Sequence, residues 1–210
     1  MAGCDEVALV VSEVLCEPDH PLRHVHFPTG GLVSLVASID RSSHLEVGLI
    51  GSEGMVGTAL VLGVATSPLR ALVQGAGSAL RMDADSFRRE LAKCPALRDT
   101  LDRYLQVRMA QLANAIACNR FHVIEARLAR WLLMTQDRMH ADALHITHDF
   151  LAPILGVRRV GITRAATSLQ KHGLISYRRG NIAILDRPGL LAASCGCYRA
   201  DREAYSRLLG

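Results

Sequence analysis

Three arginine side chains at the start of one predicted helix have the chemistry to bind nucleic acid. Arg158, Arg159 and Arg164 lie at and near the N-terminal end of a segment that we expect to be helical over about 158–172. A guanidinium group donates two parallel hydrogen bonds, either to a phosphate or to the O6 and N7 atoms of guanine. The neighbouring Thr163 can contact a phosphate or a thymine methyl group. Together these residues predict contacts with duplex DNA.

A second pair of cations, Arg178 and Arg179, lies between two β-like runs over 174–177 and 182–185. This pattern predicts a β-hairpin with a basic tip. Cations at such a tip suit backbone phosphates, which add affinity but carry no sequence information. The span 142–187 holds seven Lys and Arg against three Asp and Glu. A solvated basic face on an ordinary helical protein is the alternative, and the arginine runs taken alone favour it.

Two predicted helices joined by a short turn position these side chains. Thr147 is a suitable N-cap for a helix over 148–155, and Gly156 permits the left-handed turn that ends it. The second helix is closed by Gly173. Apolar residues spaced to hold the two helices together are Leu151, Leu155, Val157, Ile162, Ala166 and Leu169. The turn, the apolar spacing and the hairpin together predict a winged helix-turn-helix, which outweighs the merely solvated face.

The N-terminal half has the pattern of short strands separated by tight turns. The β-like runs cover 7–14, 32–36, 44–50, 69–74 and 78–82. Strands at this spacing, with no helical stretch between them, predict an antiparallel sandwich or barrel rather than a parallel sheet.

A long amphipathic helix is expected next, over about 96–117. Its apolar stripe has spacings of 4, 4, 7 and 4 residues and consists of Leu97, Leu101, Leu105, Leu112 and Ile116. At about 1.5 Å per residue the helix is roughly 33 Å long. This periodicity is equally consistent with two arrangements. The helix can pack against the β domain of its own chain, or it can form the seam between two copies of the chain.

The net charge of the chain changes sign near residue 95, where the long helix is expected to begin. Residues 1–94 have a net charge of −4 and residues 95–210 a net charge of +8.

No run of about 18 apolar residues occurs, so we expect no membrane span. The first 14 residues are acidic, unlike a signal peptide, so we expect a cytoplasmic protein. Aromatic residues make up only 4%, which disfavours stacking on single-stranded bases.

The sequence contains no recognisable catalytic motif. G-x-S-x-G, G-x-x-x-x-G-K-[ST] and H-E-x-x-H are all absent, so we expect neither enzyme activity nor a cofactor. Cys195 and Cys197 form a close pair, but their spacing is not that of a zinc finger. His24 and His26 lack further ligands nearby in the sequence. We therefore expect no metal site, and free thiols at the six cysteines.

The stretches 151–159 and 169–175, with Thr163 and Arg164 between them, resemble the winged helix of the cyclic-AMP receptor protein/FNR (Crp/Fnr) family of bacterial regulators. Three other segments resemble parts of the same family. Residues 22–34 resemble the start of its β-roll sensor domain, 96–117 its dimerisation helix, and 126–133 the first helix of its DNA-binding domain.

The resemblance implies an α+β fold in three parts. These are an N-terminal antiparallel β-roll of the cyclic-nucleotide-binding type over 1–94, a dimerisation helix over 95–118, and a C-terminal winged helix-turn-helix domain over 119–210. It also implies a transcription regulator that acts as a homodimer. The helix at about 158–172 would enter the major groove of a two-fold symmetric operator.

The resemblance assigns roles to individual residues. Arg159 and Arg164 would contact bases, and Thr147 and His148 would contact phosphate. The complete set of candidate DNA-binding residues is Thr147, His148, Arg158, Arg159, Thr163, Arg164, Arg178 and Arg179. The candidate dimer seam consists of Leu101, Leu105, Leu112 and Ile116. Double-stranded DNA and a second copy of the chain are the expected partners, and RNA polymerase and a small-molecule effector are candidates.

The sensor domain departs from the family pattern. Members that bind cyclic nucleotides carry Gly-Glu for the ribose hydroxyl and, about ten residues later, an arginine for the cyclic phosphate. Here Thr58 follows Gly57 in place of the glutamate. Arg70, after Leu69, comes one place late, which turns it to the opposite face of a strand. We therefore expect no cyclic-AMP binding.

A different small molecule remains a candidate ligand for the same segments, with Gly57, Thr58, Leu69 and Arg70 as the pocket residues. Glu53 and Arg70 are an alternative polar pair there. The closely spaced cysteines of the family's iron–sulfur sensors are absent.

A second function, of a different class from transcription regulation, is also consistent with the sequence. A dimeric module that binds a ligand or a protein would use its helix-turn-helix for protein contacts. Binding to duplex DNA that weakens steeply with salt distinguishes the regulator from this module, because each neutralised phosphate releases counterions.

Overall fold

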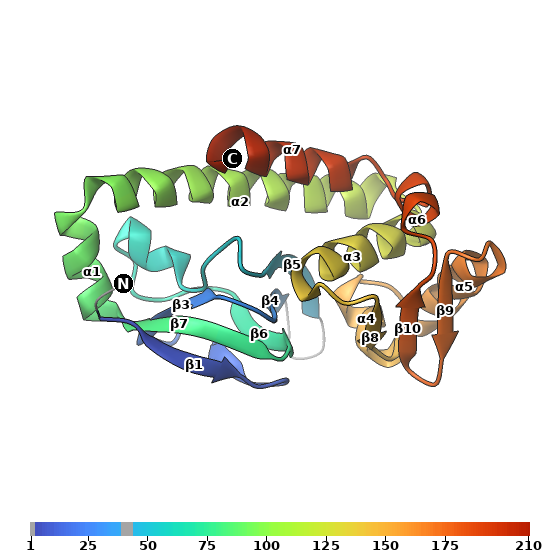
Figure 1. The fold of residues 1–210 in the computed structure, drawn as a ribbon, viewed down its shortest axis with the longest axis horizontal. Coiled ribbons are helices and arrows are strands. Elements are labelled where there is room, and N and C mark those ends of the chain that lie inside the picture. Colours follow the sequence, from blue (N-terminus) through green and yellow to red (C-terminus); the bar gives the residue numbers. More distant parts are fainter. Residues whose placement is uncertain (1–2, 39–43) are drawn as a thin grey trace.

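An N-terminal pair of antiparallel sheets, one long helix and a C-terminal helical domain with a third sheet follow one another along the chain (Figure 1). The computed structural model describes residues 3–38 and 44–210. The three described sheets are antiparallel throughout. This arrangement confirms the expected α+β fold.

Two packed sheets form the β-roll. Its strands are β1 (Asp5–Leu9), β2 (Val14–Cys16), β3 (His24–Pro28), β4 (Leu32–Ser38), β5 (His44–Ile50), β6 (Arg70–Gly75) and β7 (Gly77–Asp83). Their orders are β1-β7-β3 and β2-β6-β4-β5. The 3-10 helix η1 (Thr58–Leu62) precedes β6. The expected run 7–14 is not one strand, because a turn with Ser12 at φ 72° separates β1 from β2.

Alternation along the strands builds the core of this domain. In β6, Ala71 and Val73 are buried in the roll, whereas Arg70, Leu72 and Gln74 are half-buried on the opposite face. This two-residue period places every second side chain between the sheets. The largest fully buried side chain in the roll's core is that of Phe87 on α1 (Ala84–Lys93), which closes one end of the roll.

Helix α2 (Pro95–Phe121) is 27 residues long. Pro95 occupies its first turn, where the missing N–H costs no hydrogen bond. Its buried side chains include Leu101 and Tyr104, which pack into the core of the roll. The Tyr104 hydroxyl accepts a 3.3 Å hydrogen bond from the backbone N–H of Met55.

The C-terminal domain contains one strand that the sequence pattern did not indicate. Its elements are α3 (Ile124–Met139), β8 (Ala143–His145), α4 (His148–Ile154), α5 (Arg159–Lys171), β9 (Ile175–Arg178), β10 (Asn181–Ile184), α6 (Arg187–Ala193) and α7 (Cys197–Leu209). Strand β8 pairs with β10, which also pairs with β9. The winged helix-turn-helix is therefore present, with a three-stranded sheet.

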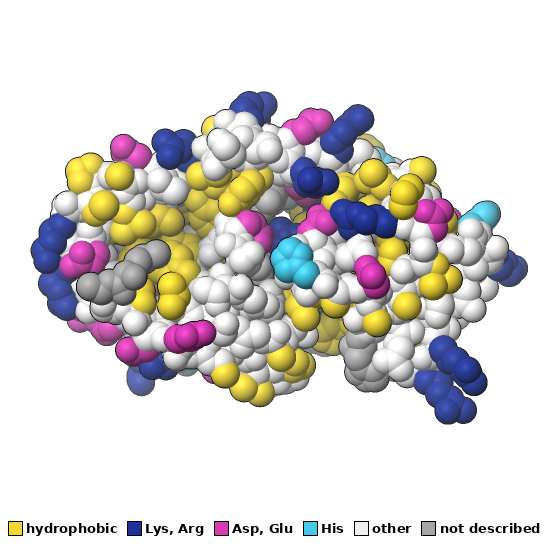
Figure 2. Space-filling model, viewed as in Figure 1, with side chains coloured by type: hydrophobic (Ala, Val, Ile, Leu, Met, Phe, Trp, Pro, Cys, Tyr) yellow, Lys and Arg dark blue, Asp and Glu magenta, His cyan; other side chains and the backbone are white. Residues whose placement is uncertain are grey.

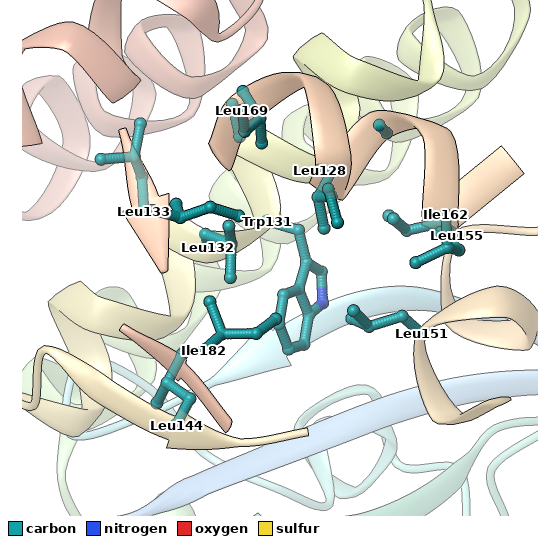
Figure 3. Close-up of a cluster of buried hydrophobic side chains, with 14 of the residues drawn as sticks. Leu128, Trp131, Leu132, Leu133, Leu144, Leu151, Leu155, Ile162, Leu169 and Ile182 are labelled. Atoms are coloured by element: carbon teal, nitrogen blue, oxygen red, sulfur yellow. The ribbon is translucent and has the colours of Figure 1, made fainter. Parts of the chain in front are cut away.

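An aliphatic core surrounds the single tryptophan of this domain. Figure 3 shows Trp131 on α3 among Leu128 and Leu132 of the same helix and Leu151 of α4. Ile162 of α5 is fully buried in the same cluster. The core holds α4 and α5 against α3, so the orientation of the helix-turn-helix depends on α3.

The two domains pack directly on one another. Leu32 and Leu49 of the roll belong to the same buried cluster as Trp131. The guanidinium of Arg138 on α3 forms a 2.8 Å salt bridge with Glu53, and both side chains are largely buried. These contacts fix the C-terminal domain against β4, β5 and the turn that follows β5.

The C-terminal helix α7 lies along α2 (Figure 1). Its buried Asp201 accepts hydrogen bonds from Arg130 on α3 at 2.6 Å and from Asn114 on α2 at 2.9 Å. The tail therefore joins the long helix to the C-terminal domain. None of the described helices is long and apolar enough to cross a membrane.

Candidate nucleic-acid interface

The turn between α4 and α5 forms as its residue types predict. The Thr147 side chain caps α4 by accepting a 3.2 Å hydrogen bond from the backbone N–H of Phe150. Gly156 has φ 60° in the turn, a left-handed conformation that side chains other than glycine adopt rarely. Arg158 is the N-cap residue of α5, and Arg159 is its first helical residue.

Helix α5 has one apolar face and one polar face. Ile162, Ala166 and Leu169 are buried in the domain core. The side chains on the other face are exposed, and they include Arg158, Arg159, Thr163 and Arg164. The structure thus brings these four candidate residues together on one accessible surface.

Thr163 and His148 contact one another across the helix-turn-helix. The Thr163 hydroxyl donates a 3.1 Å hydrogen bond to the carbonyl oxygen of Arg159, and its Oγ1 lies 3.1 Å from Nδ1 of His148. The His148 ring stacks on that of Tyr177, with 4.2 Å between centroids. Burial, followed by the nearby charge of Arg159, lowers the pKa of His148. Thr163 and Tyr177 therefore orient the His148 ring, and its Nε2 atom is buried.

Tyr177 and Asp149 also belong to this surface, although the sequence pattern does not indicate a role for either residue. Tyr177 supports His148 from β9, a long-range contact that no local spacing indicates. Asp149 lies 3.3 Å from the Arg159 guanidinium, with both side chains about two-thirds exposed. An exposed pair of this kind contributes only about 0–1 kcal/mol, so Asp149 holds Arg159 only weakly.

The wing is a two-residue hairpin with cations at its tip. Arg179 and Gly180 both have positive φ, 51° and 82°, and they connect the paired residues Arg178 and Asn181. Positive φ at both central residues is characteristic of the two-residue hairpin turns whose backbone twist matches that of the flanking strands. Arg178 and Arg179 are exposed, and Figure 2 shows cationic side chains gathered at this corner of the molecule.

The candidate ligand residues of the roll fall into two separate environments. Gly57 caps η1 with φ 95° and faces Val25, and Thr58 begins η1. Arg70 at the start of β6 forms a 3.2 Å salt bridge with Glu17, beside Leu69.

Arg70 also lines a cavity that includes neither Gly57 nor Thr58. This cavity is lined by Val36, His44, Glu46, Arg70, Leu72, Gln74, Phe150, Pro153 and Ile154. The alternative pairing of Glu53 with Arg70 is wrong, because Glu53 pairs with Arg138.

The candidate seam residues on α2 differ in exposure. Leu101 is buried within its own chain, and Leu105 and Leu112 are half-buried. Ile116 is 72% exposed, and Met109, one heptad earlier, is 64% exposed. An apolar face of α2 therefore remains uncovered in the single chain.

Comparison with known proteins supports the fold and the helix-turn-helix. Residues 126–193 match the Crp-like helix-turn-helix domain. No curated protein sequence matches the chain significantly.

Solved structures match over nearly the whole chain. FixK2 from Bradyrhizobium japonicum superposes with a TM-score of 0.76 at 14% identity, covering 91% of this chain and 98% of FixK2. The Crp/Fnr-family transcriptional regulator TTHA1359 from Thermus thermophilus gives 0.75 at 22% identity, covering 90% and 98%. The c-di-GMP responsive global regulator CLP of Xanthomonas campestris gives 0.69 at 18% identity, covering 88% and 95%.

The domain match covers α3 to α6, which include the helix-turn-helix and the wing. The solved structures share less than 25% of their residues with this chain, so their similarity shows the fold alone. The chain thus contains a Crp-like helix-turn-helix domain and has the fold of the Crp/Fnr-family transcriptional regulators.

Proposed function

We propose that this protein is a sequence-specific transcription regulator that binds duplex DNA as a homodimer. The observation that carries the proposal is the exposed arginine face of α5, opposite a fully buried apolar face and next to a basic wing. A regulator of this kind acts where the DNA is, in the bacterial cytoplasm, and needs no catalytic group. RNA polymerase is a candidate partner.

Base recognition is assigned to α5. Arg159 and Arg164 contact base edges in the major groove, where a bidentate arginine–guanine pair contributes about 1–3 kcal/mol of discrimination. Arg158 and Thr163 extend this surface. Thr147 at the start of α4, with Arg178 and Arg179 on the wing, contacts phosphates and fixes the register. His148, whose Nδ1 lies against Thr163 and whose Nε2 is buried, instead positions Thr163 on this surface.

Dimerisation is assigned to the uncovered face of α2. Ile116 and Met109 form its exposed ridge, with Leu105 and Leu112 alongside, and two such ridges bury each other when α2 pairs with a second copy. We propose the domain assignment that the sequence suggests. Residues 1–94 form the sensor domain, 95–118 the dimerisation helix and 119–210 the DNA-binding domain. A two-fold dimer binds half-sites about 34–36 Å apart, one turn of DNA.

We propose that the roll does not bind cyclic AMP. Thr58 supplies no carboxylate for a ribose hydroxyl, and Glu17 already neutralises Arg70 in a different part of the roll. An effector, if the protein uses one, is of another chemical class. The cavity beside Arg70 and Glu46 lies between the roll and α4, where occupation can influence the helix-turn-helix.

Selection of bound sequences from random DNA duplexes tests the proposed function. We expect enrichment of a two-fold symmetric sequence whose half-sites are separated by about one helical turn. Recovery of random sequences, or binding to single strands in preference to duplexes, would contradict the proposal. Binding to proteins alone would favour an interaction module.

A further inference from the structure

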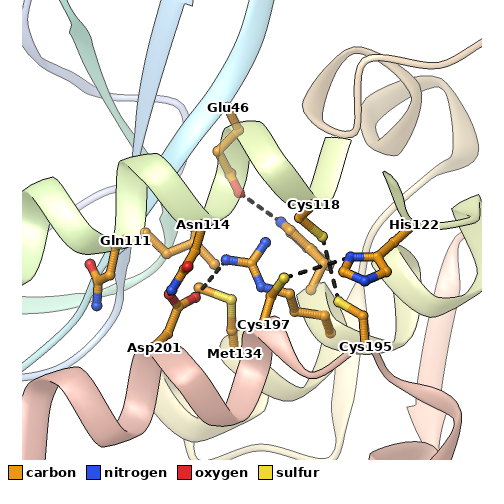
Figure 4. Close-up of polar contacts among 12 residues, drawn as sticks. Glu46, Gln111, Asn114, Cys118, His122, Met134, Cys195, Cys197 and Asp201 are labelled. Atoms are coloured by element: carbon orange, nitrogen blue, oxygen red, sulfur yellow. Dashed lines mark hydrogen bonds and ion pairs between the residues drawn. The ribbon is translucent and has the colours of Figure 1, made fainter. Parts of the chain in front are cut away.

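Four side chains with metal-binding chemistry converge where α2 ends and α7 begins. Cys118 lies in the last turns of α2, and His122 follows that helix directly. Cys195 and Cys197 flank Gly196 at the start of α7. One ligand atom from each residue lies within 4.8 Å of all the others. Figure 4 shows the four side chains pointing toward a common centre.

Two segments of the chain each supply two ligands. Cys118 and His122 are four residues apart at the end of a helix, so they lie on the same side. The Cys-Gly-Cys segment arrives from a part of the chain 77 residues further on. This is the reason that the spacing of Cys195 and Cys197 gave no zinc pattern, since the other half of the set is distant in sequence.

The separations suit one small metal ion. The Sγ atoms of Cys118 and Cys195 are 3.5 Å apart, and Sγ of Cys197 lies 3.6 Å from Nδ1 of His122. A tetrahedral zinc site with Zn–S bonds of about 2.3 Å and Zn–N bonds of about 2.0 Å has donor atoms roughly 3.5–3.8 Å apart. The four donors thus need only small shifts to surround one ion.

We propose that Cys118, His122, Cys195 and Cys197 form a four-coordinate structural site for one Zn²⁺ ion. Three thiolates and one imidazole are a Cys₃His set, which is characteristic of closed structural zinc sites. Soft sulfur ligands exclude Mg²⁺ and Ca²⁺, which bind oxygen. This proposal is independent of the proposed DNA binding.

The charges around the four residues favour an occupied site. Three thiolates and Zn²⁺ carry a net charge of −1, which needs compensation in a partly buried position. The guanidinium groups of Arg127 and Arg130 lie close enough to Cys118 and Cys195 to interact with their charges. Arg127 is itself buried. These cations offset the negative charge that an occupied site would carry.

Burial and access are both consistent with metal uptake. Cys118 and Cys195 are buried, at 1% and 7% exposure, so the protein shields the inner side of the site from solvent. His122 is exposed and Cys197 is half-exposed, which leaves a route from solvent. The bound ion would join the end of α2 to the start of α7, next to the point where α3 begins.

Metal content and Co²⁺ spectroscopy on the full-length protein test the proposal. Protein purified under reducing conditions without chelators is expected to hold one zinc per chain by mass spectrometry. After the metal is removed, Co²⁺ is expected to give the intense d–d bands of tetrahedral coordination and a thiolate-to-metal charge-transfer band. Stoichiometric Zn²⁺ is then expected to abolish both.

Ligand variants identify the site. Cys118→Ser, Cys197→Ser and His122→Ala are expected to weaken zinc binding at least tenfold. Cys94→Ser, which changes an exposed cysteine outside the cluster, is the matched control and is expected to bind normally. His122→Ala alters an exposed side chain and is expected to stay folded by circular dichroism, so the test holds even if the buried Cys118→Ser variant unfolds.

Four results would overturn the proposal. The first is folded, reduced protein that binds no zinc above the level of a zinc-free control protein. The second is an octahedral Co²⁺ spectrum. The third is unchanged zinc affinity in the folded His122→Ala and Cys197→Ser variants. A Cys118–Cys195 disulfide that persists in reductant and prevents zinc binding would count against the proposal in the same way.

Discussion

The indole N–H of Trp131 donates a 2.8 Å hydrogen bond to Oε1 of Glu46, and so joins the core helix of the helix-turn-helix domain to strand β5 of the roll. The other carboxylate oxygen of Glu46 accepts hydrogen bonds from Ser34 and from Gln74, the latter at 3.1 Å. A single carboxyl group therefore gathers donors from β4, β6 and α3. Helix α3 in turn packs against α5, so Glu46 contacts the helix on which the helix-turn-helix rests.

The Glu46 carboxyl group is expected to make stability pH-dependent. Burial raises its pKa to about 7, although the hydrogen bonds from Ser34, Trp131 and Gln74 act in the opposite direction. The folded protein thus holds this proton more tightly than the unfolded chain, whose glutamate pKa is about 4.3. Glu46 therefore stabilises the folded protein fully below the unfolded pKa of about 4.3, and this contribution is lost as the pH rises through the folded pKa of about 7.

Glu46→Gln is expected to remove this dependence. Since one pKa unit corresponds to about 1.4 kcal/mol, the free energy of unfolding of the wild type relative to the variant should fall by about 1–3 kcal/mol between pH 4.5 and pH 8. Urea unfolding at several pH values measures the difference. A constant difference across this range would show that Glu46 is ionised normally.

His26 is expected to act in the opposite direction. Burial, and then the charges of His24 and Arg81, lower its pKa to about 4. The unfolded chain binds a proton near pH 6.5, so the contribution of neutral His26 is present above pH 6.5 and is lost as the pH falls toward 4. His26→Gln should make unfolding less pH-dependent over this window, whereas His20→Gln, an exposed control, should not.

The α5 arginines and the wing arginines are expected to behave differently in DNA binding. Arg159→Ala or Arg164→Ala should weaken binding to the selected operator by about 1–3 kcal/mol and relax sequence preference at one position. Arg178→Ala or Arg179→Ala should weaken binding to all sequences and reduce the salt slope by about one. Fluorescence anisotropy on operator and scrambled duplexes separates the two effects.

A control for these variants is Arg89→Ala on α1, an exposed arginine of the roll that should leave DNA binding unchanged. An equal loss on operator and scrambled DNA for Arg159→Ala and Arg164→Ala would assign those residues to phosphate instead.

Ile116→Asp is expected to dissociate the dimer. A carboxylate on the exposed ridge of α2 would be buried without a partner in the dimer, but it is solvated in the monomer. Light scattering should show a monomer at concentrations where the wild type is a dimer, and operator affinity should fall with it. Leu62→Asp places the same charge on an exposed leucine of η1 and should remain dimeric; a dimeric Ile116→Asp would place the seam elsewhere.

Cyclic AMP is expected to leave the melting temperature unchanged. A ligand that binds the folded state raises stability with its concentration, so thermal unfolding at increasing cyclic AMP is a direct test. A saturable rise at micromolar concentrations would show that the roll binds the nucleotide without a glutamate after Gly57.

Local patterns were sufficient to predict much of the fold. The apolar period and the caps at Thr147 and Gly156 placed α4 and α5 nearly correctly, and the wing followed from the basic tip between two β-like runs. Leu101 shows the limit of such patterns. Its stripe on α2 is continuous in sequence, yet the structure buries Leu101 against the roll and leaves Ile116 exposed.

Contacts that depend on tertiary structure could not be predicted in this way. Glu46 and Trp131 are 85 residues apart, and nothing in either local sequence indicates that they meet. The same holds for Tyr177 beneath His148 and for the convergence of Cys118 with Cys195. In each case the chemistry belongs to residues that only the packing of whole elements brings together.

The central claim is specific recognition of duplex DNA by α5, and a salt series on the selected operator tests it most directly. We predict that the logarithm of the association constant falls linearly with the logarithm of salt concentration, with a slope set by several neutralised phosphates. We also predict affinity about 10³-fold or more above that for scrambled DNA at physiological salt. Equal affinity for both duplexes, or binding that is insensitive to salt, would contradict the account.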